Sequence, residues 1–168
     1  MSFKVGDKVV YPNHGVGVIE EIGEQQGQGA ERAFYCLRIL ANQSTVMVPT
    51  ANTDQVGLRK VVSKKEIDRV FRILRASEIP VAGDWKGRFQ ENSDRMRTGS
   101  IEEVAHVLKN LALLSQSKSL SYRERKMLDK ARYLVISEIA EVSKMSEQKV
   151  EEKVDRAIGL TLREPTDN

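Results

Sequence analysis

The chain has 168 residues, of which 40% are hydrophobic, so it can form one large or two small domains around a buried core. It has no apolar run long enough to cross a membrane and no signal peptide, and its single cysteine excludes an internal disulfide, so we expect a cytoplasmic protein. The net charge is +3, and the whole excess of Lys and Arg over Asp and Glu lies in residues 61–168.

The first third of the chain predicts short β-strands. Its β-branched and aromatic residues gather in short segments separated by turns that contain Gly, Pro or Asn. The expected strands are Val9–Tyr11, Val16–Ile22, Phe34–Leu40, Thr45–Val48 and Gln55–Val62. Five short strands in so few residues predict a small barrel of the Tudor or SH3 type.

The periodicity becomes helical after this region. Ser63, Ser100 and Ser121 each stand three residues before a glutamate and precede apolar residues at helical spacing, a pattern typical of a capping box at a helix start. Asp84 is expected to cap a further helix that begins at Trp85. A final helix is expected to start at Ser146 and to carry Val150, Val154 and Ile158.

These patterns predict an α+β protein with two domains. The first, over residues 1–62, is the β-barrel. The second, over residues 63–162, is all-helical with about five helices. The remaining residues, 163–168, are expected to form a frayed tail.

No residue pattern indicates catalysis or metal binding. His14 and His106 are far apart in sequence and have no metal-ligating neighbour, and the single cysteine, Cys36, lacks a partner and a nucleophile context. We therefore expect a protein that is not an enzyme, that holds no metal or cofactor, and that acts through its surfaces.

One candidate surface is a locally basic helix. Residues 118–132 contain six cations and two anions. Arg123, Lys126 and Lys130 recur at spacings of three and four along one flank of the expected apolar stripe, and Arg125 and Arg132 share the other flank. The surface is either an ordinary charged helix face or a phosphate-binding surface.

Two further features leave alternatives open. Thr45, Val46, Met47, Val48 and Pro49 form a short segment that is either an interior barrel strand or an edge strand which a partner strand could extend. Trp85, followed by Lys86 and Arg88, either packs in a core or presses against a DNA base step while the cations hold phosphates.

Several of these segments, taken together, resemble the CarD/CdnL family of bacterial transcription regulators. In the first part they are Lys4–Gly17, Val48–Pro49 and Val56–Arg59, and in the second part they are Trp85 with Arg88 and Leu120–Arg132. The N-terminal segment also resembles the polymerase-binding module of transcription-repair coupling factors. The likeness covers nearly the whole chain.

The resemblance implies a Tudor-like domain that docks on the RNA polymerase β subunit through residues 45–49. It also implies a helical domain that contacts promoter DNA near the −10 element, at the upstream edge of the bubble, and so stabilises the open complex. Trp85 would be the wedge, and the phosphate contacts are expected from Lys86, Arg88, Arg123, Arg125, Lys126 and Lys130. We expect a monomer that associates with the nucleoid and binds no membrane and no small-molecule substrate.

Some positions depart from the family pattern. Met47 and Gln25 stand where some relatives carry polymerase-contacting cations, so docking would rely on main-chain pairing and apolar contact. Gln90 and Leu114 stand where some relatives carry DNA-facing cations, so affinity for DNA alone is expected to be weak. The alternative function is a two-domain adaptor that joins two proteins without contacting nucleic acid.

Overall fold

The computed structural model describes residues 2–27, 30–76 and 85–159. The chain forms two compact units, Met1–Val61 and Val62–Asn168. The first unit is built mainly of strands and the second of helices, so the predicted α+β class is confirmed. None of the helices in the described ranges is long and apolar enough to span a membrane.

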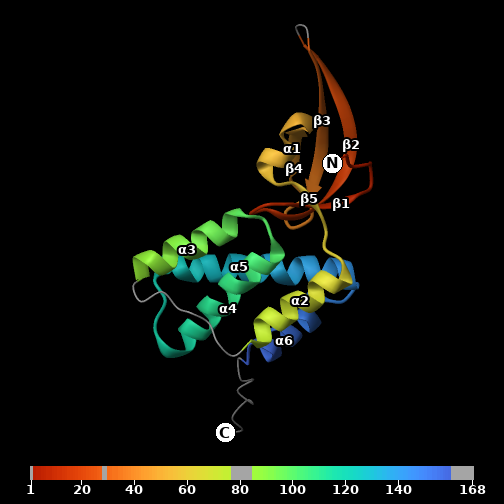
Figure 1. Ribbon diagram of the computed structural model, residues 1–168. Coiled ribbons are helices and arrows are strands. Elements are labelled where there is room, and N and C mark those ends of the chain that lie inside the picture. The colour runs from red at the N-terminus through yellow and green to blue at the C-terminus, as the bar shows by residue number, and fades with distance from the viewer. Residues whose placement is uncertain (1, 28–29, 77–84, 160–168) are drawn as a thin grey trace. The chain divides into compact units, whose positions relative to one another are not determined.

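The first unit is an antiparallel sheet with the strand order β4-β3-β2-β1-β5 (Figure 1). Among the described strands β4 pairs only with β3, so it lies at one edge of the sheet. The strands are β1 (Lys8–Tyr11), β2 (Gly15–Gly27), β3 (Ala30–Ile39), β4 (Thr45–Pro49) and β5 (Arg59–Lys60).

The sheet is held by a small apolar cluster on one face. Side chains alternate across a strand, so Tyr35 and Leu37 of β3, two residues apart, both lie in the cluster. Phe3 packs at the edge of this cluster. The centroids of the Phe3 and Tyr35 rings are 5.6 Å apart in an edge-to-face arrangement, and the backbone N–H of Phe3 donates to the Tyr35 hydroxyl at 3.2 Å. The buried members are Phe3, Val9, Ile19, Tyr35, Leu37, Val48 and Leu58.

The strand expected over Gln55–Val62 is largely wrong. A 3₁₀ turn, η1 (Thr50–Asn52), leads into a short helix, α1 (Thr53–Val56), and only β5 is extended. Gly57 explains the break: it adopts φ +75° and its N–H bonds back to the carbonyls of Thr53 and Asp54, which ends the helix. Strand propensity does not include the local cap chemistry at Gly57, so it predicted a strand where the chain ends a short helix.

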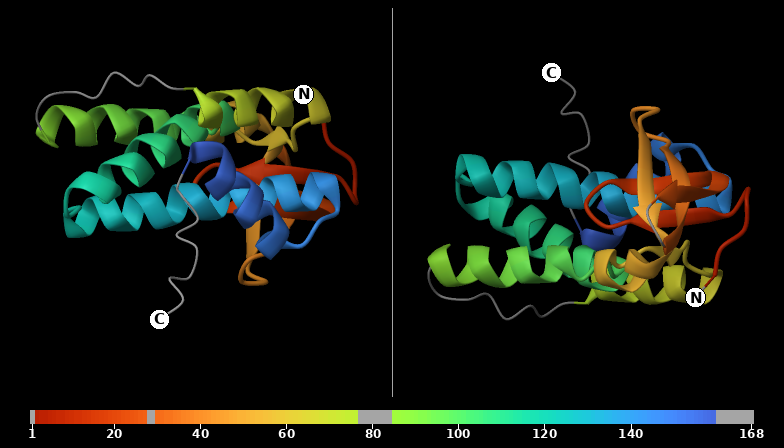
Figure 2. Two further views of the ribbon diagram at one scale, coloured as in Figure 1. Left: turned by 90° about the horizontal axis from the view of Figure 1, so that it is seen from below. Right: turned by 90° about the horizontal axis from the view of Figure 1, so that it is seen from above.

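In its described residues the second unit contains five helices, in line with the prediction of about five. Both views in Figure 2 show α4 lying between α3 and α5, and α4 also packs against α2 and α6. Ala105, Val107, Leu108 and Leu111 of α4 are fully buried, so this helix forms the centre of the core. The helices are α2 (Lys64–Arg75), α3 (Trp85–Arg97), α4 (Ile101–Ser117), α5 (Tyr122–Ser143) and α6 (Glu147–Ile158).

The helix starts follow the predicted caps. The capping box at Ser63 is complete, with a reciprocal bond from the Ser63 N–H to the Glu66 carboxylate at 2.8 Å. Ser100 and Ser121 accept from the backbone N–H groups of Glu103 and Glu124, at 3.4 and 3.2 Å. The predicted cap Asp84 and the predicted frayed tail lie outside the described residues.

Two buried charged side chains join distant parts of the helical unit. Lys109 of α4 donates from Nζ to the carbonyl of Ile73, in the last turn of α2, at 3.1 Å, and burial lowers its pKa. Glu138 of α5 accepts from the backbone N–H of Val62, just before α2, at 2.9 Å. Each end of α2 is therefore tied to a helix of the core by a side chain that is 2% exposed.

Candidate functional site

The edge strand β4 presents an apolar surface. Its one buried residue is Val48, which is 2% exposed and anchors the strand in the core. Met47 is consequently turned outward and is 52% exposed, Val46 is half-buried, and Thr45 and Pro49 are exposed. An edge strand offers unpaired backbone N–H and C=O groups, and a flexible thioether adapts to many surfaces, so β4 suits main-chain pairing with a partner strand.

The start of α5 presents a basic surface. Arg123, Arg125, Lys126 and Lys130 are all exposed. The Nζ of Lys126 lies 4.7 Å from the centroid of the Tyr122 ring, which is itself exposed, and Arg125 reaches the Leu120 carbonyl at 3.4 Å. Within the described residues none of these four cations is in an ion pair. Their charges therefore remain available to an anionic ligand.

One anion of the same helix turn is removed from this surface. Glu124 is buried and forms a two-pronged ion pair with Arg88 of α3: Nε–H donates to Oε2 at 2.9 Å and Nη2–H donates to Oε1 at 3.2 Å. Their side chains are only 14% and 4% exposed. The hydrogen bond from Arg88 lowers the pKa of Glu124, against the opposing effect of burial, and Ser121 adds a smaller effect in the same direction.

This ion pair positions the start of α3. Arg88 lies one turn after Trp85, the first residue of α3, and Glu124 lies in the first turn of α5. The pair therefore links the two predicted DNA-contacting segments, although they are 36 residues apart in sequence. Lys86 is exposed, and the side chain of Trp85 lies outside the part of the chain that the structure describes.

Two of the cations that the sequence analysis singled out, Arg88 and Arg132, form ion pairs inside the protein. Arg88 was predicted to hold a phosphate, and its guanidinium instead lies on Glu124, so phosphate contact by Arg88 stays a prediction. Arg132 turns toward α6, where Nη2–H donates to Glu151 at 2.9 Å and to Asp155 at 2.5 Å. The charge of Arg132 is therefore paired within the protein, unlike that of Arg125.

Sequence reasoning missed Glu124 as a site residue. Its position after Ser121 matched a capping box, and the Ser121 half of that box is present. The carboxylate, however, accepts from Arg88, a contact over a long sequence separation that no local pattern encodes. No group of three or more potential ligands in the described ranges could hold a metal ion.

Removal of either member of the Arg88–Glu124 pair should be costly. Arg88→Met and Glu124→Gln should each lower the free energy of unfolding by roughly 3–5 kcal/mol, because each leaves a buried polar partner unsatisfied. Arg95→Met is the matched control on α3: its pair with Glu103 is more exposed, so the loss should be at most about 1 kcal/mol. Urea unfolding measures both, and equal small losses would contradict a structural role for the pair.

The same pair should make stability dependent on acid pH. Since Arg88 holds the pKa of Glu124 below its ordinary value of 4.5, the stabilisation is complete above about pH 4.5 and is lost as the pH falls through the lowered pKa. The stability difference between wild type and Glu124→Gln should therefore narrow below that pH, and a constant difference would contradict the assignment.

Comparisons with known proteins agree with both units. Residues 3–62 match the CarD-like/TRCF RID domain and residues 69–155 match the C-terminal domain of CarD. The chain is 32% identical over 148 residues to a Bacillus subtilis (strain 168) protein described as putative transcription factor YdeB, covering 88% of this chain and 97% of that protein. It is 36% identical to the N-terminal domain of Myxococcus xanthus CarD, solved by NMR, over 35% of this chain and 79% of that one, with a TM-score of 0.31. The chain belongs to the CarD-like family of transcription regulators.

Proposed function

We propose that this protein docks on the β subunit of RNA polymerase and stabilises the promoter open complex by contacting DNA at the upstream edge of the bubble. The observation that carries the proposal is the presence, in one chain, of an available edge strand in the first unit and an unneutralised cationic helix face in the second. Membership of a family of transcription regulators supports it.

Docking is assigned to β4. Main-chain bonds to a strand of the β subunit would supply most of the affinity, and exposed alternate side chains would supply specificity. Met47 is the largest exposed side chain of β4, and its register partner on β3 is Cys36. Because Met47 carries no charge, the contact is apolar and depends little on salt.

DNA contact is assigned to the α5 cations and Lys86. Arg123, Arg125, Lys126 and Lys130 would hold phosphates, which fix position and carry no base information. The few exposed cations, without a base-reading arrangement of paired Arg, Asn or Gln side chains, favour weak binding that becomes useful only when polymerase holds the protein near its promoter.

Trp85 is assigned as the wedge. A large apolar side chain that enters a partly unstacked base step binds opened DNA better than closed DNA, and only this difference in affinity shifts the equilibrium toward the open complex. Arg88 would then act mainly as a positioning residue, because its pairing with Glu124 fixes the first turn of α3, which begins at Trp85.

Met47→Glu should abolish capture of RNA polymerase while the fold is retained, because the carboxylate would be desolvated in an apolar strand contact. Val5→Glu is the matched control, since Val5 is an exposed apolar residue of the same unit, 60% exposed, that lies outside β4. Pull-down with the purified β subunit measures both. Undiminished capture by Met47→Glu, with Val5→Glu behaving alike, would refute docking through β4.

Neutralising Arg123, Lys126 and Lys130 to Gln should shorten open-complex lifetime to a similar extent at all promoters and flatten its dependence on salt. Lys149→Gln, an exposed cation of α6, is the control and should leave both quantities unchanged. Filter-binding decay of open complexes at several salt concentrations provides the measurement. A loss confined to particular promoters would indicate base readout instead.

Trp85→Ala tests the wedge and separates the regulator from a protein–protein adaptor. We expect a nearly unchanged melting temperature, intact polymerase binding and a sharply shortened open-complex lifetime. If Trp85 is packed in a core, the same change should cost roughly 3–5 kcal/mol of stability and weaken every activity together. An adaptor without DNA contact would show no change in open-complex lifetime for this variant or for the α5 variants.

A further inference from the structure

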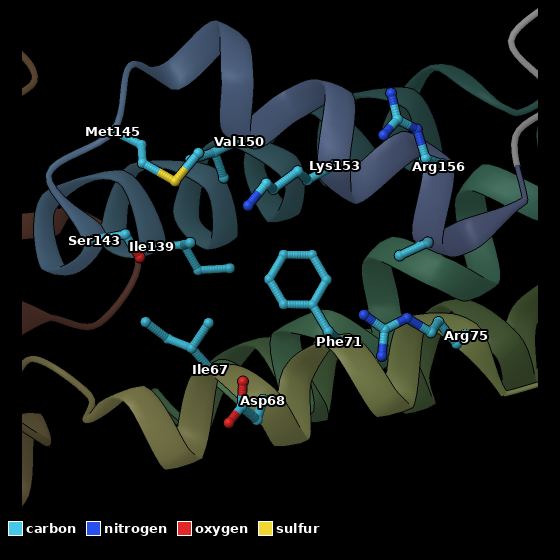
Figure 3. Close-up of a pocket in the computed structure, with 11 residues that line it drawn as sticks. Ile67, Asp68, Phe71, Arg75, Ile139, Ser143, Met145, Val150, Lys153 and Arg156 are labelled. Carbon is cyan, nitrogen blue, oxygen red and sulfur yellow. The ribbon is translucent and has the colours of Figure 1, made fainter.

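A groove of about 480 Å³ lies between α2, α6 and the C-terminal end of α5 (Figure 3). Its floor is apolar. Ile67, Ile139 and Val150 are buried there, and Phe71, Met145 and Ala157 are half-buried beside them. This groove lies apart from the candidate DNA-contacting face: Arg123 and Ser143 are at opposite ends of α5, about 30 Å apart at 1.5 Å per residue.

The rim of the groove is cationic. Arg75 of α2 and Lys153 and Arg156 of α6 line it, and Figure 3 shows Lys153 extending over the space between the two helices. Asp68 is the one anion among the lining residues. In the described part of the chain the three cations form no ion pair, and the guanidinium of Arg75 lies 5.7 Å from the centroid of the Phe71 ring.

Internal packing explains this arrangement only in part. Arg75 and Arg156 lie in the last turns of their helices, where a cation offsets the partial negative charge of the helix end. Lys153 lies in the middle of α6 and has no such role. Three half-buried apolar side chains, Phe71, Met145 and Ala157, lie beside three cations that form no ion pair in the described part of the chain. Such a surface is complementary to a ligand that brings both apolar groups and carboxylates.

We infer that this groove binds an acidic polypeptide segment of a partner protein, with one or two large apolar side chains on the floor and carboxylates at Arg75, Lys153 and Arg156. The exposure of all three cations favours a polypeptide over a small molecule. Small-molecule sites enclose the ligand and place a few polar groups inside, whereas these charges are spread along two helices. Helix-lined grooves of this kind accept an amphipathic segment lengthwise.

The inference can be tested by NMR without polymerase or DNA, so its outcome is independent of the proposed function. The probe is a synthetic peptide in which one leucine and one phenylalanine stand among aspartates and glutamates, titrated at low salt into the ¹⁵N-labelled full chain. We expect shifts of the amide signals of Phe71, Ile139 and Val150. Binding should weaken as salt rises, and a peptide with Asn and Gln in place of the acids should not bind.

The charge-reversed variant Lys153→Glu/Arg156→Glu should bind the acidic peptide at least about tenfold more weakly. The matched control is Lys118→Glu/Lys149→Glu, which makes the same change in net charge at two exposed cations outside the groove and should bind normally. Thermal melting checks that both variants are folded. If the reversed variant is unstable, Lys153→Gln/Arg156→Gln replaces it, with a smaller loss expected.

Three results would overturn the inference. The first is the absence of groove shifts at millimolar acidic peptide. The second is binding that both double variants weaken equally, since it would reflect net charge alone. The third is binding of dodecanoate in the groove without binding of the peptide, which would identify a site for small amphipathic carboxylates.

Discussion

The ion pair between Arg88 and Glu124 is the constraint on which the candidate DNA-contacting face depends. Few of the described side chains of α3 are buried, and its first turn carries Trp85 and Lys86. The two-pronged contact joins that turn to the first turn of α5, which carries the exposed cations. A planar guanidinium on a carboxylate fixes orientation as well as distance, so two helices that are remote in sequence can act on one ligand.

Two carboxylates of the long helix α5 are withdrawn from its surface, whereas Asp129 stays exposed. Its carboxylates Glu124 and Glu138 are buried and serve as internal anchors for Arg88 and for the backbone of Val62. Its cations Arg123, Lys126 and Lys130 remain exposed. Because the anions near the start of the helix are partly withdrawn from solvent, the potential outside is more positive than the composition of the segment indicates.

The β-sheet unit has an edge strand, β4, with exposed apolar side chains. An exposed edge strand with apolar side chains is a risk for aggregation, and proteins usually shorten or cover such edges. β4 is short, ends at Pro49 and is anchored by one buried residue, Val48. These features keep the strand ordered and leave its outer edge open. The proposed docking therefore uses the outer edge of β4, which no other described strand pairs with.

Local chemistry in the sequence determined most of the elements. The serine caps at 63, 100 and 121 and the apolar periodicity located the helices, because caps and periodicity act within a few residues. The same reasoning failed over Gln55–Val62, where Gly57 in a left-handed conformation ends a short helix. Sequence spacing also located the cations of α5, but it could not distinguish exposed Lys126 from Arg132, which α6 neutralises.

Contacts between distant segments were decided by the tertiary structure alone. The pairing of Arg88 with Glu124, the edge position of β4 and the cationic groove between α2 and α6 each depend on which elements pack together. The sequence specifies the charge and size of each side chain. The partner and the exposure of that side chain follow from packing over the whole unit. For that reason the sequence determined which residues could bind a phosphate or a strand, and the fold decided which of them remain free to do so.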